Sequence, residues 1–410
     1  MTKEQKQHAA EVAALIALYA WAEQSLLAGV ARILRRTTPD FMGRLAARSL
    51  TRQLTQTVVA RLDALTGPMI DQVVRLSSAA GAVDGEKAAR DAIDAALSGT
   101  TGDNLVRLTG VAGVPDELAA ARGAGGPPMP PSGPTAAGGT GSGGFDLSVP
   151  HGVRAEAAIR QDLVSELDDV RFRLTRLPDD IYKAITPQGA IQQVLQGNVT
   201  PAYAQAKAWR ELTANGITGF TDKGGREWSL SAYVEMAVRT SVQRAYNASH
   251  IERMHALGIH YFTVADDGHP CPKCFPWQWK VLTDGPVEHP EIPVDGTIQD
   301  AVAAGLLHPN CRHSFVPVIP GVTKLPKPRM WSMDDADRYN QTQKQRRLEL
   351  NIRKAKKQVE YASDPQTAAE ARAKVRKRQA AMRAFIEETG LVRRSRREQL
   401  NLTMDQYPAP

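Results

Sequence analysis

The sequence is poor in cysteine and in aromatic residues. Only three cysteines occur among 410 residues, and aromatic side chains make up 6% of the chain. An odd and sparse cysteine count argues against a secreted scaffold held by disulfides. A mean hydropathy of −0.34 argues against a polytopic membrane protein, and we expect no membrane partner. The 42% of apolar residues is ordinary for a chain that buries a core, which argues against a wholly disordered protein.

Familiar catalytic signatures are also missing. The sequence contains no Walker motif and no Gly-x-Ser-x-Gly elbow, and no Ser/His/Asp set can be assembled from it. His250-x-Glu252-x-x-His255 resembles a zinc-protease helix, but its histidines are five residues apart instead of four, so we interpret it as a solvated helix face. Asp266-Asp267 is predicted to be a pair of exposed turn acids. We expect no small-molecule substrate.

Positive charge is modest overall but concentrated near the C-terminus. The formal net charge is +7, and residues 341–400 contain 17 Lys and Arg against 7 Asp and Glu. The remainder of the chain is therefore slightly acidic. One basic segment on a near-neutral body predicts contact with an acidic polymer or surface.

The pattern of apolar, polar and Gly/Pro-rich segments divides the chain into four parts. We expect a helical domain over 1–122, a flexible Gly/Pro-rich linker over 123–150, an α+β module over 151–325 and a basic helical hairpin or arm over 326–410. The predicted fold class is α+β, predominantly α-helical. In 123–144, nine Gly and five Pro occur without an apolar period, so this segment cannot bury enough surface to order itself.

In the N-terminal part, Ala and Leu recur at three- and four-residue spacing, which predicts helices. Gly67-Pro68 and Gly81 are expected to separate them, giving helices over about 3–35, 41–65, 69–80 and 86–98. The apolar run at 12–22 superficially resembles a signal peptide. Acidic residues precede it and the periodicity continues past it, so we interpret it as an amphipathic helix of a chain made in the cytoplasm.

The central and C-terminal parts carry start and stop signals for helices and strands. In the central part, these signals predict a helix over Val153–Leu174, followed by N-caps at Thr186-Pro187 and Thr200-Pro201 and a hairpin over 220–228. They also predict a second helix from Ser231 to about Leu257, which ends at Gly258. Strands are predicted at Tyr261–Val264 and Phe315–Val318. The C-terminal part predicts two helices over 335–388 with a break at Asp364-Pro365 and a stop at Gly390. Their apolar stripes are narrow: Leu348, Ile352, Ala355 and Val359, then Ala371, Val375, Met382 and Ile386. Narrow stripes favour a helical hairpin or a docked arm over a globular core.

The cysteines form the strongest local pattern. Cys271-Pro272-Lys273-Cys274 is followed, after 36 intervening residues, by Cys311-Arg312-His313. A Cys-x-x-Cys turn presents two thiolates to one ion, and zinc takes four soft or borderline ligands in a tetrahedron. We expect structural zinc, held by Cys271, Cys274, Cys311 and either His313 or His308.

Three other interpretations of the cysteines stay open. They are reduced thiols that lie near one another by chance; a redox Cys-x-x-Cys, which is disfavoured because such a motif follows a strand and opens a helix; and a zinc-dependent nuclease or hydrolase. The last needs an open coordination position and a nearby base, for which His269, Glu288 and His289 are the candidates.

The basic segment has two interpretations, a solvated helix face and a sequence-independent contact with DNA phosphates. Its scarce aromatics do not favour base stacking. The candidate DNA-binding residues are Arg346, Arg347, Arg353, Lys354, Lys356, Lys357, Arg376, Lys377, Arg378, Arg393, Arg394, Arg396 and Arg397.

Three ordered blocks resemble the phage minor capsid protein 2 family. The first is residues 216–236, which include Gly224-Gly225-Arg226-Glu227-Trp228, with Arg239-Thr240 following. The second comprises Trp277-Gln278-Trp279-Lys280 and residues 308–315, and closes on Pro320-Gly321. The third comprises residues 339–346 and 385–391. The resemblance covers about residues 150–400.

The resemblance implies a non-enzymatic structural protein of a tailed-bacteriophage head, beside the portal, that aids capsid assembly and DNA packaging or delivery. It implies a virion location and contact with the portal or the major capsid protein, and with phage DNA. The related Mu-type head morphogenesis proteins share a Cys-x-x-Cys and a His-Pro-x-Cys-Arg pattern. A basic DNA-binding protein unrelated to virions is the further alternative.

Overall fold

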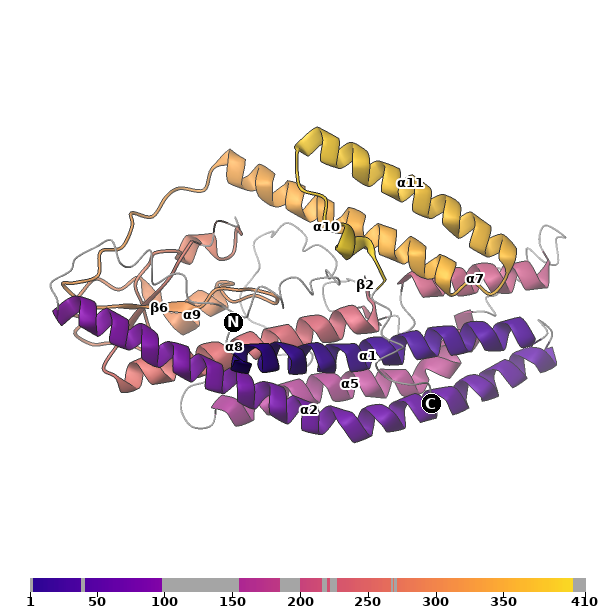
Figure 1. The fold of residues 1–410 in the computed structure, drawn as a ribbon, viewed down its shortest axis with the longest axis horizontal. Helices are drawn as coiled ribbons and strands as arrows, with labels where there is room; N and C mark the ends of the chain where they lie inside the picture. The colour runs from indigo at the N-terminus through magenta and orange to yellow at the C-terminus, as the bar shows by residue number, and fades with distance from the viewer. Residues whose placement is uncertain are drawn as a thin grey trace.

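The computed structural model describes residues 3–37, 41–97, 155–184, 200–215, 220–221, 227–266, 268 and 271–400. Long helices dominate these residues, and a small mixed sheet lies at one end of the molecule (Figure 1). The prediction of a mostly helical α+β fold is confirmed. The expected linker at 123–150 lies outside the described residues.

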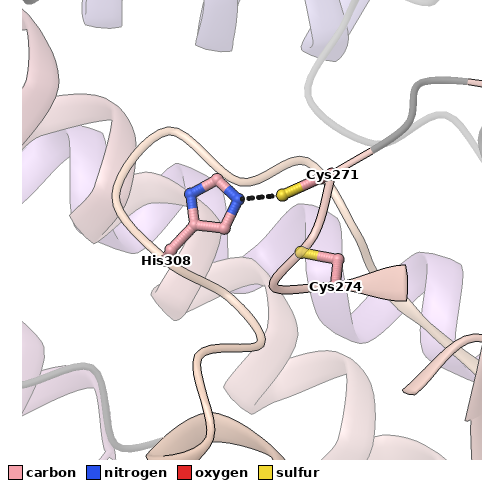
Figure 2. A group of neighbouring side chains, drawn as sticks. All are labelled: Cys271, Cys274 and His308. Atoms are coloured by element: carbon pink, nitrogen blue, oxygen red, sulfur yellow. Dashed lines mark hydrogen bonds between the residues drawn. The ribbon is translucent and has the colours of Figure 1, made fainter. Parts of the chain in front are cut away.

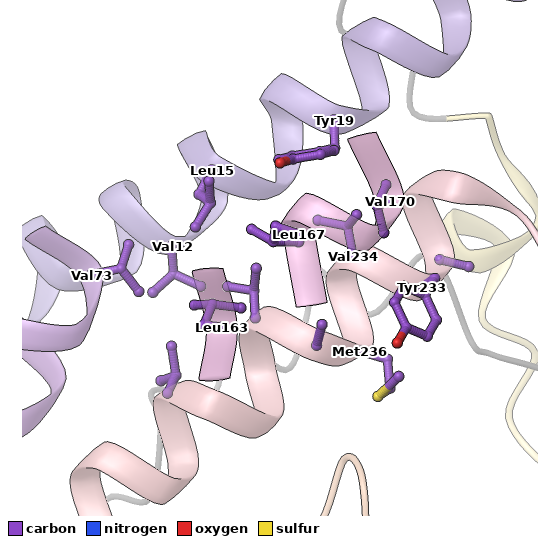
Figure 3. Packing of buried hydrophobic residues seen from close by; sticks show 14 of the residues in the cluster. Val12, Leu15, Tyr19, Val73, Leu163, Leu167, Val170, Tyr233, Val234 and Met236 are labelled. Atoms are coloured by element: carbon purple, nitrogen blue, oxygen red, sulfur yellow. The ribbon is translucent and has the colours of Figure 1, made fainter. Parts of the chain in front are cut away.

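Four long helices lie side by side and form the main core (Figure 1). They are α1 (Lys3–Arg36), α2 (Phe41–Leu97), α5 (Ala155–Ala184) and α8 (Leu230–Ala256). Apolar residues at three- and four-residue spacing face inward from each helix, among them Leu15, Leu167 and Val234 (Figure 3). The N-terminal helices therefore cover the same core as the central ones.

Among the described helices, α1 contains a span, Gln5–Arg36, that is long and apolar enough to cross a membrane by length and composition. Of its most apolar window, 67% is buried within the fold. Its apolar residues therefore belong to the core between α1, α2 and α8.

The prediction of three separate helices between 41 and 98 is wrong, because α2 runs unbroken through Pro68 and Gly81. Pro68 removes the hydrogen bond to the carbonyl of Ala64, and both residues are exposed, so water can solvate that carbonyl. Gly81 and Gly85 face α8, where an added Cβ would collide with the carbonyl oxygens of Tyr246 and His250. These glycines are sites of close helix contact and not helix stops.

The predicted segments of the central part are mostly found. Helix α5 extends ten residues beyond the predicted end at Leu174, and Thr200 Oγ1 caps α7 (Pro201–Asn215) by accepting from the backbone N of Tyr203 at 3.2 Å. Strands β1 (Phe220–Thr221) and β2 (Glu227–Trp228) pair antiparallel, as the hairpin prediction requires. Thr186-Pro187 and the turn at Gly224-Gly225 lie outside the described residues.

The small sheet has the strand order β5-β4-β3-β6. Its strands are β3 (Tyr261–Val264), β4 (Leu282–Thr283), β5 (Gly296–Thr297) and β6 (Phe315–Val318). The two longer strands, β3 and β6, have the predicted bounds and pair antiparallel, with Tyr261 opposite Val318 and Val264 opposite Phe315. The loop between them also holds η1 (Phe275–Trp277) and α9 (Ile298–Ala303).

The C-terminal part forms the predicted helical hairpin (Figure 1). It consists of α10 (Met333–Glu360) and α11 (Pro365–Thr389), followed by η2 (Ser395–Glu398). Asp364 caps α11 ahead of Pro365, and Gly390 ends it with a φ of 67°. The hairpin is docked on the rest of the molecule: Trp209 Nε1 donates to the carbonyl of Tyr361 at 2.7 Å, and Tyr361 belongs to the main apolar cluster.

Candidate metal centre

The sheet register brings the two cysteine segments together. Because β3 and β6 are antiparallel, the residues after Val264 and those before Phe315 leave the same end of the sheet. Cys271 and Cys274 lie on the first of these segments, and Cys311 lies on the second. Thiols that are far apart in the sequence thus meet in the loops at this end of the sheet.

A tight turn in each of the two segments positions the candidate metal-binding side chains. The backbone N of Phe275 donates to the carbonyl of Cys271 at 2.9 Å, which closes the Cys-x-x-Cys turn. In the second segment, the backbone N of Cys311 donates to the carbonyl of His308 at 2.8 Å. Leu307, just before that turn, and Asn310, within it, have φ values of 56° and 63°, a left-handed conformation that residues other than glycine rarely adopt.

The five predicted donors form one cluster of two overlapping triads. Cys271, Cys274 and His308 form the first triad (Figure 2), and Cys274, Cys311 and His313 form the second. Within each triad the donor atoms lie within 4.8 Å of one another. Cys274, which is fully buried, belongs to both.

The separations suit tetrahedral coordination. With zinc–sulfur bonds of about 2.3 Å, two sulfurs on one tetrahedron lie about 3.8 Å apart, and a sulfur and an imidazole nitrogen about 3.6 Å apart. Cys274 Sγ lies 3.7 Å from Cys311 Sγ. Cys271 Sγ lies 3.2 Å from His308 Nε2, and Cys311 Sγ lies 3.3 Å from His313 Nδ1. These three pairs therefore fit zinc in donor type and spacing, while Cys271 and Cys311 belong to different triads.

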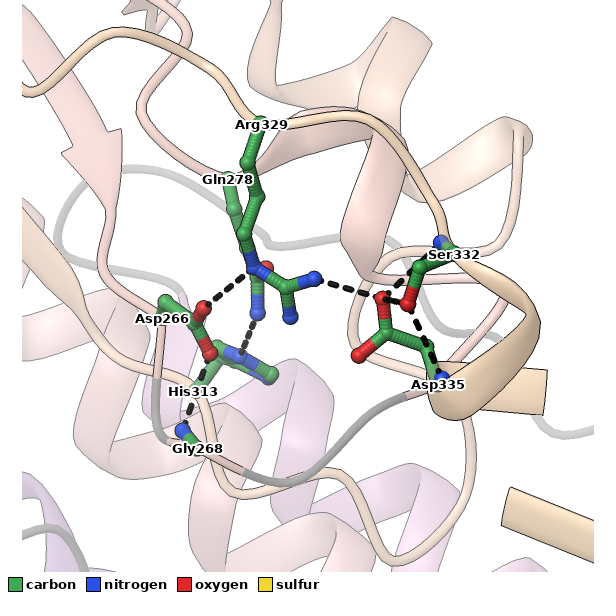
Figure 4. A network of polar contacts seen from close by, with 7 residues as sticks. All are labelled: Asp266, Gly268, Gln278, His313, Arg329, Ser332 and Asp335. Carbon is green, nitrogen blue, oxygen red and sulfur yellow. Dashed lines mark hydrogen bonds and ion pairs between the residues drawn. The ribbon is translucent and has the colours of Figure 1, made fainter. Parts of the chain in front are cut away.

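Neighbouring groups orient both imidazoles. His308 Nδ1 lies 2.9 Å from the carbonyl oxygen of Pro309, so Nδ1 carries a hydrogen and Nε2 is the ring nitrogen that faces Cys271. His313 Nε2 lies 3.4 Å from the side-chain amide of Gln278 (Figure 4), which leaves Nδ1 facing Cys311. A hydrogen bond on the second ring nitrogen is the usual support of a metal-binding histidine.

The cluster favours thiolates. A hydrogen bond from Cys274 lowers the pKa of Cys271 and of Cys311 below the ordinary thiol value, and nearby imidazoles add to the effect. The pKa of Cys274, which supplies that proton, is raised. Burial alone would lower the pKa of His308, but the sulfurs of Cys271 and Cys311 raise it to about 9. Thiolates are the form that binds metals.

Of the residues considered as bases for a zinc-dependent nuclease or hydrolase, those that the structure describes are not found in the cysteine/histidine cluster. Among the described residues, neither Glu288 nor His289 belongs to a group of metal-binding side chains, and both are exposed. His269 and Asp267 lie outside the described residues. Asp266 accepts a hydrogen bond from Arg329 at 3.3 Å.

The interpretation of His250 as part of a solvated helix face is wrong. His250 is fully buried, between the carbonyl oxygens of Gly81 at 3.3 Å and Phe315 at 3.0 Å. Burial lowers its pKa, so the neutral ring donates to one of these carbonyls. His250 thereby connects α8 with α2 and β6. The signal available in the sequence was the glycine pair on α2, which allows the close approach.

A set of contacts around Arg329, which the sequence did not reveal, connects the cysteine loop to α10. Arg329, in the segment between β6 and α10, pairs with Asp266 and, at 2.5 Å, with Asp335 in the first turn of α10 (Figure 4). Its guanidinium lies 4.7 Å from the ring centroid of Phe275, the residue after Cys274. The cysteine loop and the hairpin are therefore mechanically linked.

The thirteen candidate DNA-binding residues divide into two groups. Seven are exposed: Arg346, Arg347, Arg376, Lys377, Arg378, Arg394 and Arg396. The other six are buried or half-buried: Arg353, Lys354, Lys356, Lys357, Arg393 and Arg397. Several of these are engaged within the fold; Lys357 pairs with the buried Glu23 at 2.5 Å, and Arg393 pairs with the buried Glu398 at 2.6 Å. The sequence could not separate outward-facing charges from internal ones.

The fold and the cluster define a class: a mostly helical protein with a small mixed sheet whose loops carry a cysteine/histidine cluster. The sequence profile of the family described as Phage minor capsid protein 2 matches residues 157–387, more than half of the chain. The chain belongs to this family, and it is accordingly a structural phage protein that associates with other components of the virion head. Comparisons with curated proteins and with solved structures found no match.

Proposed function

We propose that this protein is a non-enzymatic, portal-proximal component of a tailed-phage head that aids capsid assembly and DNA packaging or delivery. The single observation that carries the proposal is membership of the minor capsid protein 2 family over 157–387. The chain would contact the portal or the major capsid protein.

Mass spectrometry and cross-linking of purified phage heads test this proposal. We expect the chain in heads at few copies, with cross-links that concentrate on the portal. Its absence from mature heads and from assembly intermediates would overturn the structural assignment. Cross-links confined to major capsid protein far from the portal would overturn the portal-proximal position.

We propose further that the cluster at Cys271, Cys274 and Cys311 holds structural zinc, with His313 or His308 as the fourth ligand. Four protein ligands fill the tetrahedron and leave no position for a reactive water, which supports a structural role. Zinc would hold together a segment whose regular structure is limited to two-residue strands and short helices. Binding of a structural zinc supplies on the order of 10 kcal/mol, enough to order such loops.

Metal analysis of the full-length protein, after dialysis against a weak chelator, tests this site. We expect about one tightly held zinc per chain, and its loss in Cys274→Ser, because this thiol belongs to both donor triads. Thr263→Ser, at a buried position of the adjacent strand, is the matched control and should keep the metal. Less than about half an equivalent in the unmodified protein would refute the site. Comparison of His308→Ala with His313→Ala identifies the fourth ligand.

We also propose that the C-terminal hairpin contacts DNA phosphates through its exposed basic residues. Helix α11 supports this, because its residues Arg376, Lys377 and Arg378 are all exposed. No acidic residue occurs between Glu370 and Glu387. Such a surface attracts polyanions without reading base sequence.

A further inference from the structure

Three side chains with metal-binding atoms converge at the end of β3 opposite to the cysteine cluster. His255 lies in the last turn of α8, His260 immediately precedes β3, and Asp284 immediately follows β4. The cysteine segment begins beyond the other end of β3, after Val264. The two groups are therefore separate, and the proposed function does not use this one.

The backbone explains why the two histidines meet. Helix α8 ends in a turn in which the backbone N of Gly258 donates to the carbonyl of His255 at 2.9 Å. Gly258 has a φ of 85°, which reverses the chain in a conformation that glycine adopts readily. The reversal returns His260 to His255, with ring centroids 4.6 Å apart and ring planes at 82°.

The sheet register supplies the third group. Strands β3 and β4 pair antiparallel with Tyr261 opposite Thr283. One position further along that register, His260 lies opposite Asp284. The arrangement thus follows from a helix stop and a strand pairing, both of which are fixed by the fold and not by the side chains themselves.

The three donor atoms are close enough to share one ion. All lie within 4.8 Å of one another, and His255 Nε2 is 3.5 Å from Asp284 Oδ2. Nitrogen and oxygen ligands on a tetrahedron with bonds near 2.0–2.1 Å lie about 3.3 Å apart. Two imidazoles and a carboxylate suit divalent first-row transition metals better than magnesium or calcium, which prefer oxygen ligands only.

We propose that His255, His260 and Asp284 form a second, solvent-exposed site for a divalent transition-metal ion of the zinc and cobalt type. Three protein ligands leave coordination open to water, unlike the closed cysteine cluster. The side chains of His255 and Asp284 are 48% and 23% exposed, so the ion exchanges with solvent. The bound ion connects the end of α8 to the end of the β3–β4 strand pair.

Zinc titration of the reduced full-length protein by equilibrium dialysis tests the proposal. We expect one equivalent to bind in the micromolar range in addition to any tightly held zinc. His260→Ala and Asp284→Asn should each lose this equivalent or weaken it at least ~10-fold, because removal of a ligand costs no less than removal of a supporting residue. His289→Ala, another exposed histidine of the same module, is the matched control and should bind as the unmodified protein does.

The test compares the zinc bound by each variant with the zinc bound by the unmodified protein. Its outcome therefore does not depend on whether the cysteine cluster binds zinc. Cobalt gives an independent readout: the equivalent that depends on His260 and Asp284 should add visible absorption without a thiolate-to-cobalt charge-transfer band. Retention of the second equivalent by both His260→Ala and Asp284→Asn would overturn the proposal. Equal loss in His289→Ala, or a thiolate band for the second equivalent, would also overturn it.

Discussion

At the scale of single residues, Glu23 connects three helices through one carboxylate. It is 3% exposed on α1, accepts from the backbone N of Ser231 in the first turn of α8 at 3.0 Å, and pairs with Lys357 of α10 at 2.5 Å. A carboxylate at a helix N-terminus is favoured by the helix dipole as well as by the hydrogen bond. Nothing in the local sequence marked Glu23, because its partners lie more than 200 residues away.

Glu23→Gln tests this connection. Burial alone would raise the pKa of Glu23, but attraction to Lys357 and the hydrogen bonds from Lys357 and Ser231 hold it below the ordinary 4.5. We expect the substitution to cost about 1.5–3 kcal/mol of unfolding free energy at pH 7, in the range of hydrogen bonds to charged groups. Urea denaturation followed by circular dichroism measures it.

The pH dependence of this cost has a definite sign. A depressed carboxylate pKa stabilises the fold above the unfolded pKa, and that contribution is lost as the pH falls through the folded value. The difference between the unmodified protein and Glu23→Gln should therefore be full at pH 7 and shrink below pH 4.5. Glu86→Gln, in a surface pair with Arg253, is the control and should have a smaller effect. A difference that does not change with pH would contradict the role of the charge.

At the scale of elements, the contact between α2 and α8 depends on two glycines. Alanine normally stabilises a helix interior relative to glycine by about 0.5–1 kcal/mol. At Gly81 and Gly85 the new methyl group would collide with backbone carbonyls of α8, which cannot rotate away. We expect Gly81→Ala or Gly85→Ala to destabilise the protein by about 1–3 kcal/mol, as overpacking does.

Gly29→Ala is the matched control on α1. Its nearest contact is the end of the Leu54 side chain, which can change rotamer, so the loss of stability should be smaller. The midpoint temperatures of thermal unfolding rank the three variants by stability. A stability of Gly81→Ala equal to or above that of Gly29→Ala would show that the two helices are not in close contact.

The exposed face of α11 makes a second prediction at this scale. Replacement of Arg376, Lys377 and Arg378 by Gln should weaken retention of duplex DNA at low salt and lower the salt slope by about 0.9 for each phosphate that is no longer neutralised. Replacement of three exposed basic residues on α1 and α2, Arg32, Arg75 and Lys87, removes the same charge elsewhere and should change retention less. An equal reduction in both triple variants would assign binding to net charge and not to α11.

At the scale of the whole molecule, one apolar core joins the N-terminal helices to the rest. The main cluster includes Val12 on α1, Val234 on α8, Phe262 on β3 and Tyr361 after α10. Removal of α1 and α2 would expose the apolar face of α8 and α5. We therefore expect the full-length protein to unfold in one transition, with coincident midpoints by fluorescence and circular dichroism.

A fragment of residues 151–410 tests this expectation directly. It should aggregate or unfold at a markedly lower temperature than the full-length protein, because large exposed apolar patches promote association. A soluble, monomeric fragment with an unchanged transition would contradict the shared core. It would support instead an autonomous N-terminal domain over 1–122.

Much of the fold and of the candidate site followed from the sequence by itself. Caps such as Asp364-Pro365, stops such as Gly258 and Gly390, and the apolar strands β3 and β6 are local signals, because the interactions that form them involve neighbours in the chain. The spacing of the three cysteines likewise identified the donors that the structure brings together.

Other features were decided only in three dimensions. Gly81 looked like a helix stop until α8 was found against it, and His250 looked solvated until two carbonyls were found around it. Lys357 was one basic residue among many until Glu23 was found beside it. In each case the deciding partner lies far away in the sequence. Burial and pairing depend on what packs against a side chain, and the local sequence does not contain that information.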